Sequence, residues 1–221
     1  MFNIGDKVVY PNHGAGTIVG KETKNILDEE KKYYIMKLPI GEMKVMIPVE
    51  KIDEIGIRDV VDEDEADNVF HLLSGEKSKM SQNWNRRYRA NMEKLKTGDI
   101  YEVSEVVRNL TIRDEQKGLS TGEKKMLSNA RQILISELVL AKDTDEEKIV
   151  NEIEEIFRKN REEREARKKR EEEAAEEKAA AAEEKSEEEE TEAEENEDNE
   201  ENEDNEDKAT AEEEVEKEKA E

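Results

Sequence analysis

The sequence predicts an α+β protein with a small N-terminal SH3-like or Tudor-like β-barrel, a compact all-α bundle of about five helices, and a disordered acidic C-terminal tail. Three observations support this prediction. Up to about residue 59, short runs of β-branched and aromatic residues alternate with turn residues. From residue 62 onward, apolar residues recur at the helical spacing of about 3.6. The C-terminal end carries most of the net charge of −25. We therefore expect domains at 1–59, 60–160 and 161–221.

The first domain is predicted to contain four or five short antiparallel strands. The expected strands span residues 7–10, 16–23, 32–38 and 43–47, with a short closing strand at 55–57. Gly, Pro and Asn residues separate these runs, and these residue types favour turns. Short strands of this number suit a small barrel, because closure protects the edges of the sheet.

The second domain is predicted to be a helical bundle. Three of the expected helix starts, at Asp99, Ser120 and Thr144, have a glutamate three residues later, which is the spacing of a capping box. Each expected helix has one apolar stripe and one charged face. The stripes must therefore pack against one another in a bundle.

The C-terminal region cannot form a hydrophobic core. Residues 161–185 consist almost wholly of Glu, Arg, Lys and Ala, and we expect them to prolong the last helix. From residue 186 the sequence is rich in Glu, Asp and Asn with almost no apolar residue. Such a composition cannot offset the entropy of ordering, so this part is predicted to be disordered.

Several function classes find no support in the sequence. The chain has no cysteine, which excludes disulfides, thiolate metal sites and a cysteine nucleophile. Gly14-Ala15-Gly16 begins a dinucleotide-binding pattern, but Val19 occupies the position of its third glycine. His13 lies in a predicted turn, and no metal-ligand spacing links it to His71. We predict no enzyme activity, no cofactor, no metal and no membrane partner, and we expect a cytoplasmic monomer.

The most informative segment surrounds Trp84, the only tryptophan. Residues 77–96 have a net charge of +6 within a strongly acidic chain. Cations around large flat side chains are typical of a surface that binds nucleic acid. Helical spacing with Tyr88 permits two interpretations, in which Trp84 either anchors the bundle core or presents a half-exposed ring at the helix start. The candidate phosphate contacts are the cations of this helix: Arg86, Arg87, Arg89 and Lys94.

Four separate motifs resemble the CarD/CdnL family of bacterial transcription regulators. In chain order they are Val8-Val9-Tyr10-Pro11-Asn12-His13-Gly14, Gly56-Ile57-Arg58-Asp59-Val60, Asn83-Trp84-Asn85-Arg86-Arg87-Tyr88-Arg89-Ala90-Asn91 and Gly118-Leu119-Ser120-Thr121-Gly122-Glu123-Lys124. The resemblance covers about residues 1–160. The first region is also similar to the polymerase-binding module of transcription-repair coupling factors, but no helicase motifs follow. A free-standing regulator is implied.

The resemblance implies a function and a set of contacts. The Tudor-like domain would dock on the β subunit of RNA polymerase, and the helical domain would place Trp84 in the minor groove of promoter DNA at the upstream edge of the bubble. Open promoter complexes would thereby be stabilised, without a code for reading bases. For the polymerase face, the resemblance points to Lys24, Val45 and Met46. Relatives often carry Arg at the position of Met46, so apolar packing is expected to replace one charge contact there.

Two further interpretations remain open. The barrel is alternatively a peptide-binding module, and the charged helices a scaffold surface, in a protein unrelated to transcription. The acidic tail is hypothesised to compete with DNA for Arg86, Arg87 and Arg89, or alternatively to act only as a solubilising segment.

Overall fold

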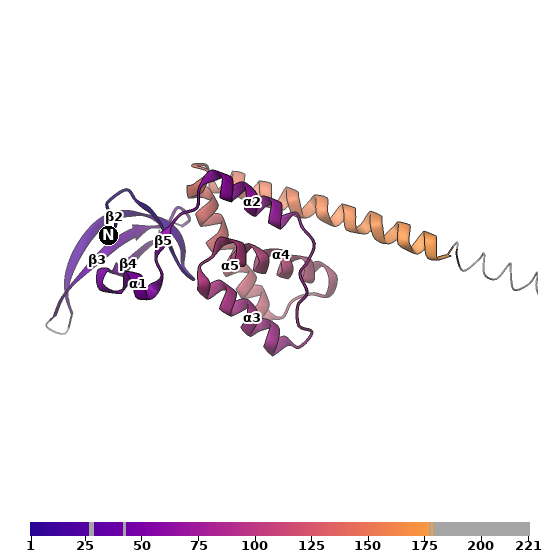
Figure 1. Ribbon diagram of the computed structural model, residues 1–221, viewed down its shortest axis with the longest axis horizontal. Helices are drawn as coiled ribbons and strands as arrows, with labels where there is room; N and C mark the ends of the chain where they lie inside the picture. Colours follow the sequence, from indigo (N-terminus) through magenta and orange to yellow (C-terminus); the bar gives the residue numbers. More distant parts are fainter. Residues whose placement is uncertain (27–28, 42, 177, 179–221) are drawn as a thin grey trace, which may run out of the picture. The chain divides into compact units, whose positions relative to one another are not determined.

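The computed structural model describes residues 1–26, 29–41, 43–176 and 178 (Figure 1). The chain divides into two units, residues 1–162 and 163–221. In the second unit, the described residues 163–176 and 178 are helical. The disorder predicted from residue 186 onward falls outside the described residues.

The first unit begins with a five-stranded antiparallel sheet. Its strands are β1 (Lys7–Tyr10), β2 (Gly14–Ile26), β3 (Glu29–Lys37), β4 (Lys44–Pro48) and β5 (Arg58–Asp59). They are hydrogen-bonded in the order β4-β3-β2-β1-β5, so that β4 and β5 lie at the two ends of that order. One face packs a small core, which consists of Val8, Ile18, Tyr34, Met36, Leu38 and Ile47. The predicted N-terminal β-domain is confirmed.

The predicted closing strand at residues 55–57 is wrong. A 3₁₀ turn, η1 (Val49–Lys51), and a short helix, α1 (Ile52–Ile55), follow β4, and strand pairing resumes only at Arg58. Ile52 and Ile55 have the three-residue spacing of a helix turn. Gly56 ends this turn with a φ of 79°, and its N–H donates to the Ile52 carbonyl. A glycine reaches this left-handed conformation at little cost, so the helix ends there.

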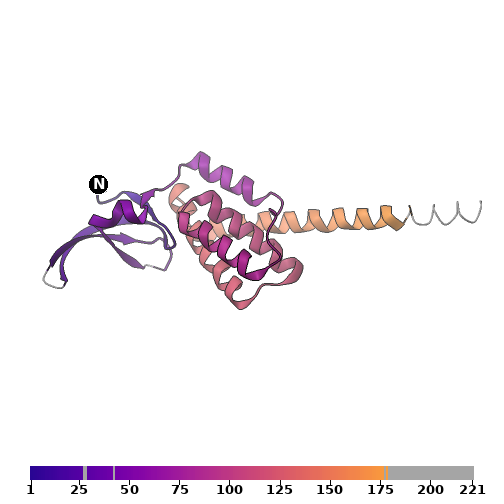
Figure 2. The same ribbon diagram turned by 60° about the horizontal axis from the view of Figure 1, so that its bottom comes forward.

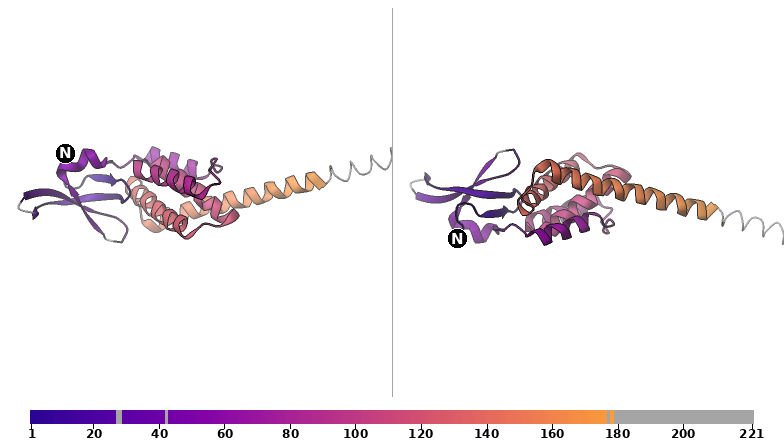
Figure 3. Two further views of the ribbon diagram at one scale, coloured as in Figure 1. Left: turned by 90° about the horizontal axis from the view of Figure 1, so that it is seen from below. Right: turned by 90° about the horizontal axis from the view of Figure 1, so that it is seen from above.

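Helices form the rest of the first unit, as predicted. They are α2 (Glu63–Leu73), α3 (Trp84–Thr97), α4 (Ile100–Lys117), α5 (Thr121–Ala141) and a last helical segment from residue 146 to the end of the unit. Figure 2 shows α3, α4 and α5 side by side, and the two views of Figure 3 show the same packing from opposite sides. Their apolar stripes form one core that includes Phe70, Leu95, Leu110, Leu134 and Phe157. The predicted helical bundle is therefore confirmed.

Two of the three predicted capping boxes differ from the expectation. Ser120 forms the complete box with Glu123 at the start of α5. Asp99 caps α4, but Glu102 lies 3.4 Å from the Lys94 ammonium and forms an ion pair with it. Thr144 is not the cap, because the last helical segment begins only at residue 146. Charge pairing accounts for the difference at Glu102, and a later helix start accounts for the difference at Thr144.

An ion pair with a buried carboxylate joins the sheet to the bundle. The Arg58 guanidinium on β5 donates to both carboxylate oxygens of Glu137 on α5, at 2.5 and 2.9 Å, and to the Gly98 carbonyl. Glu137 is only 1% exposed. Next to it, the Ala15 N–H donates to the Ser136 hydroxyl at 2.8 Å. Burial raises the pKa of Glu137, and the charge and hydrogen bonds of Arg58 offset this rise only in part.

Removing Arg58 is expected to make stability depend on pH. Arg58→Ala leaves the buried Glu137 carboxylate unpaired, so the free energy of unfolding near neutral pH should fall by about 3 kcal/mol. Because the folded-state pKa of Glu137 is raised, protonation stabilises the folded form, and the loss should shrink as the pH falls toward about 5. Urea denaturation of both proteins at the two pH values measures this effect. An equal loss of stability at both pH values would show that the ionisation of Glu137 does not cause the pH dependence.

Candidate nucleic-acid interface

The helix α3 begins at Trp84 and leaves its indole half-exposed. The Asn83 side chain caps the helix by accepting from the Arg86 N–H at 3.1 Å. The Trp84 ring stacks on Tyr88, with 5.2 Å between the ring centroids and 27° between the planes. Trp84 remains 44% exposed. Of the two interpretations left open by the sequence, the one in which Trp84 anchors the bundle core is therefore wrong.

The first turn of α5 lies against the two rings. The Trp84 Nε1–H donates to the Ser120 hydroxyl oxygen at 2.9 Å. A Cβ added to Gly122 would lie 3.5 Å from the Tyr88 ring and 3.7 Å from the Trp84 ring. We call Trp84, Tyr88 and the Ser120–Gly122 turn the aromatic platform. It unites two of the four motifs found in the sequence, which are far apart along the chain.

The prediction that Arg87 belongs to an exposed cationic face is wrong. Arg87 is 3% exposed, and its Nε–H donates to the Glu123 carboxylate at 2.7 Å. Its Nη1 donates to the carbonyl oxygens of Ser81 and Gln82, in the loop that precedes α3. The buried stripe of α3 includes Arg87. The basic composition of the segment gave no indication that Arg87 lies on the buried face of the helix.

The buried Glu123 side chain contacts residues at the starts of both α3 and α5. It is 2% exposed and accepts hydrogen bonds from Arg87 and from the N–H and hydroxyl of Ser120. Burial acts to raise the pKa of Glu123, but these hydrogen bonds prevail and hold the pKa below its usual value. The ionised carboxylate therefore neutralises the Arg87 charge beneath the platform.

Lys94 is also engaged within the protein. Its ammonium contacts Glu105 and lies 3.4 Å from Glu102, both on α4. Burial lowers the pKa of Lys94, whereas the hydrogen bond to Glu105 raises it, and the net direction is upward. Lys94 is thus held in ion pairs, and we do not count it among the cations open to a ligand.

Four exposed cations on the first two turns of α3 and α5 are open to a ligand. Arg86 and Arg89 are exposed and form no ion pair with any residue that the structure describes, which agrees with their predicted position. Lys124 and Lys125 on the first turns of α5 are exposed and unpaired in the same sense. The sequence reasoning missed these two lysines. Their position directly after the capping-box glutamate was the signal that could have placed them beside Ser120.

The three residues predicted to contact polymerase do not share one face. The Lys24 ammonium lies 3.2 Å from the Met46 sulfur, so the structure brings these two side chains together. Val45 pairs with Met36, and Met46 pairs with Ile35. Because adjacent residues of a strand point to opposite faces, Val45 packs toward the sheet core and Met46 away from it. Val45 supports the strand rather than the face of Lys24 and Met46.

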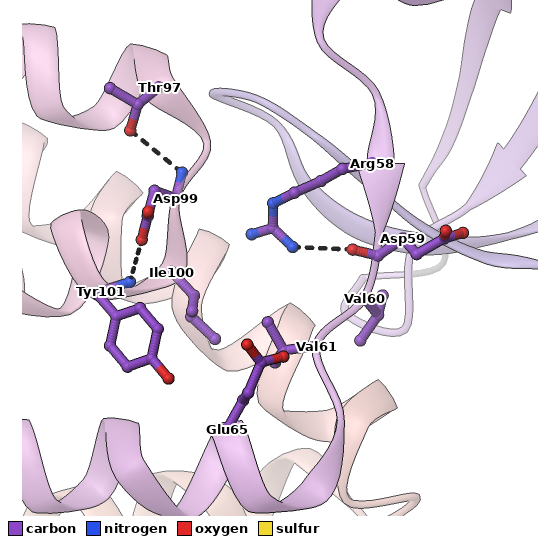
Figure 4. Close-up of a pocket in the computed structure, with 9 residues that line it drawn as sticks. All are labelled: Arg58, Asp59, Val60, Val61, Glu65, Thr97, Asp99, Ile100 and Tyr101. Carbon is purple, nitrogen blue, oxygen red and sulfur yellow. Dashed lines mark hydrogen bonds between the residues drawn. The ribbon is translucent and has the colours of Figure 1, made fainter.

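An open pocket of about 520 Å³ lies near the joint between sheet and bundle (Figure 4). Its lining consists of Arg58, Asp59, Val60, Val61, Glu65, Thr97, Asp99, Ile100 and Tyr101. Its polar groups serve the fold: Arg58 donates to the Asp59 carbonyl, and Asp99 caps α4. Over the described ranges, no group of three or more His, Cys, Asp or Glu side chains is arranged to hold a metal ion.

Comparisons with known proteins identify the family. Residues 2–61 match the CarD-like/TRCF RID domain, and residues 68–154 match the CarD C-terminal domain. YdeB of Bacillus subtilis (strain 168), which is named as a candidate transcription factor, is 44% identical over 149 residues, covering 67% of this chain and 97% of YdeB. The chain belongs to the CarD family. The resemblance inferred from the four motifs is thereby confirmed.

Two solved structures are also similar to the N-terminal region. The N-terminal domain of Myxococcus xanthus CarD is 29% identical, covers 27% of this chain and 79% of its own, and gives a TM-score of 0.24. CdnLNt from the same organism is 32% identical, covers 28% of this chain and 89% of its own, and gives a TM-score of 0.26. The family assignment rests on the sequence matches and not on these two.

Family membership defines the broad role of the protein. It is a CarD-like transcription factor whose N-terminal domain is of the RNA polymerase-interacting type, and the prediction that it is not an enzyme holds. Among the described residues, every helix is too short or too polar to cross a membrane.

The two neighbouring arginines of α3 should respond differently to substitution. Arg87→Met leaves the Glu123 carboxylate buried without its cation, and the free energy of unfolding should fall by about 3 to 5 kcal/mol. Arg86→Met, the matched control one residue away, should change it by less than about 0.5 kcal/mol because Arg86 is exposed. Urea denaturation of the three proteins compares them. Similar stabilities for the two variants would contradict the burial of Arg87.

Proposed function

We propose that this protein docks on the β subunit of RNA polymerase and stabilises the promoter open complex, with Trp84 as a minor-groove wedge at the upstream edge of the bubble. The observation that carries the proposal is the half-exposed indole, supported by Tyr88 and Ser120. The same two helices carry exposed cations that form no ion pair with any described residue. Such a ring has a flat apolar surface available for a base step in distorted DNA.

The sheet offers a surface for polymerase. Among the described strands, β4 is hydrogen-bonded only to β3, so its other edge presents backbone groups that a strand of another protein can pair with. Lys24 and Met46 lie together close to this edge. A surface of this kind combines backbone pairing with one apolar and one cationic contact.

The platform offers contacts to DNA that do not depend on sequence. Arg86, Arg89, Lys124 and Lys125 are suited to phosphate contacts, and four such contacts give a logarithmic salt slope of about −3.6 on duplex DNA. Binding of this strength is weak on its own. Docking on polymerase makes DNA binding intramolecular, at an effective concentration on the order of millimolar. Weak contacts are then sufficient.

The indole supplies the preference for the open complex. A ligand shifts an equilibrium only through contacts that differ between the two states. A ring that stacks on a base exposed by distortion is such a contact, and it is worth about 1 to 3 kcal/mol. This free energy corresponds to a shift of about fivefold to hundredfold toward the open complex.

The alternative of a non-transcriptional scaffold is less well supported. It explains neither the family membership nor the exposure of the only tryptophan. We propose that the protein acts as a monomer in the cytoplasm, where bacterial transcription takes place.

Removing the indole should shorten the life of the open complex. With purified polymerase, Trp84→Ala should reduce the lifetime by about fivefold to hundredfold, since the stacking contact is lost. Trp84→Phe, which keeps a flat ring, should retain part of the effect. Circular dichroism establishes that both variants fold. If a folded Trp84→Ala protein gives the native lifetime, the wedge role is excluded.

The face of Lys24 and Met46 should determine polymerase affinity. A combined Lys24→Glu and Met46→Asp variant should bind the polymerase β subunit at least about tenfold more weakly, because it reverses one charge and removes one apolar contact. Lys32→Glu is the matched control, since Lys32 is exposed on the same hairpin but on the opposite face. Affinity is measured by titration with labelled full-length protein. Equal losses for the variant and the control would argue against this face.

A further inference from the structure

A chain of three hydrogen bonds connects the exposed indole to a buried ion pair. The Trp84 Nε1–H donates to the Ser120 hydroxyl oxygen at 2.9 Å. That hydroxyl lies 2.9 Å from one oxygen of the Glu123 carboxylate, and the Arg87 Nε–H donates to the other oxygen at 2.7 Å. Trp84 and Arg87 lie one turn apart on α3, while Ser120 and Glu123 form the capping box of α5.

The donors and acceptors in this series of hydrogen bonds allow only one orientation of the Ser120 hydroxyl. An indole N–H is solely a donor, and an ionised carboxylate is solely an acceptor. The single hydroxyl hydrogen of Ser120 must therefore point to Glu123, which leaves the hydroxyl oxygen to accept from Trp84. A hydroxyl that donates to a charged acceptor is itself a better acceptor, because hydrogen bonds in a chain polarise one another. The buried ion pair thus strengthens the contact made by the indole.

We propose that Ser120 is a positioning residue for Trp84: its hydroxyl, fixed by Glu123 and Arg87, holds the indole in the orientation that inserts into promoter DNA. The inference rests on the proposed function, because it concerns the orientation of the same wedge. The indole is held at two places, with Tyr88 stacked on its face and Ser120 at its N–H edge. Without the second contact, an exposed side chain in the first turn of a helix is free to change rotamer.

The expected consequence is a loss of pre-organisation. An indole that samples several rotamers must be ordered when it binds, and this ordering weakens the contact without removing it. The open-complex lifetime should fall by about threefold to tenfold when the Ser120 contact is lost, a smaller effect than removal of the ring.

The test needs a variant that removes the hydroxyl but preserves the helix cap. Ser120→Gly meets this requirement, because glycine is a good N-cap and lowers helix stability by only a few tenths of a kcal/mol relative to serine, by the general ranking. Ser120→Thr retains a hydroxyl and serves as the conservative rescue. Asp99→Gly is the control, since it likewise replaces a helix cap, that of α4, by glycine, and no hydrogen bond links Asp99 to Trp84 in the described residues.

The fluorescence of the free protein gives a direct readout, because Trp84 is the only tryptophan. Ser120→Gly should lower the emission anisotropy and increase quenching by acrylamide, whereas Ser120→Thr and Asp99→Gly should match the native protein. If Ser120→Gly leaves both quantities unchanged, Ser120 does not hold the indole and the inference is overturned. This arm is independent of polymerase and DNA.

The second arm measures open-complex lifetime with the same variants and with Trp84→Ala. A shorter lifetime for Ser120→Gly, recovered in Ser120→Thr, supports the inference. A native lifetime for Ser120→Gly, together with a short one for Trp84→Ala, overturns the inference and leaves the proposed function standing. If Trp84→Ala itself has the native lifetime, the proposed function fails together with the functional part of the inference, and the fluorescence arm still decides whether Ser120 orders the ring.

Discussion

The buried ion pair between Arg87 and Glu123 is the interaction on which the candidate interface depends. Both side chains are almost fully buried, and each also binds a helix start: Arg87 holds the carbonyls before α3, and Glu123 completes the capping box of α5. A charge buried alone would be costly, so the two residues require each other. Their pairing brings the first turns of α3 and α5 together, and the exposed indole rests on that junction.

The charge of the surface follows from how the cations are divided. Arg87, which is buried, and Lys94, which is partly buried, are neutralised by glutamates, while Arg86, Arg89, Lys124 and Lys125 are exposed and pair with no residue that the structure describes. The net charge of the segment around Trp84 is therefore larger than the number of its cations that are open to a ligand. The start of α5 supplies two further exposed cations. A strongly acidic protein can thus present a local cationic surface, and the field near that surface steers the binding of an anion.

Sequence reasoning predicted the architecture well, because hydrophobic spacing and turn residues are local signals. It placed β1 at the residues that the structure gives and the complete capping box at Ser120. It failed where the outcome depends on contacts between distant residues. Arg87 looks like a surface cation until Glu123 is known to lie beside it, and Glu102 leaves its expected cap because Lys94 attracts it. Lys124 and Lys125 could not be assigned from the sequence, because only the folded structure brings the start of α5 against Trp84.

The helix α5 connects the two proposed binding surfaces within the first unit. Near its start, Ser120 and Glu123 hold the aromatic platform, and farther along Ser136 and Glu137 bind the sheet through Ala15 and Arg58. Fourteen residues separate Glu123 from Glu137, which corresponds to about 21 Å along a helix. A packed helix of this length resists bending. The distance between the sheet and the indole is therefore a property of α5. In the proposed function, docking of the sheet would also determine where the ring meets DNA.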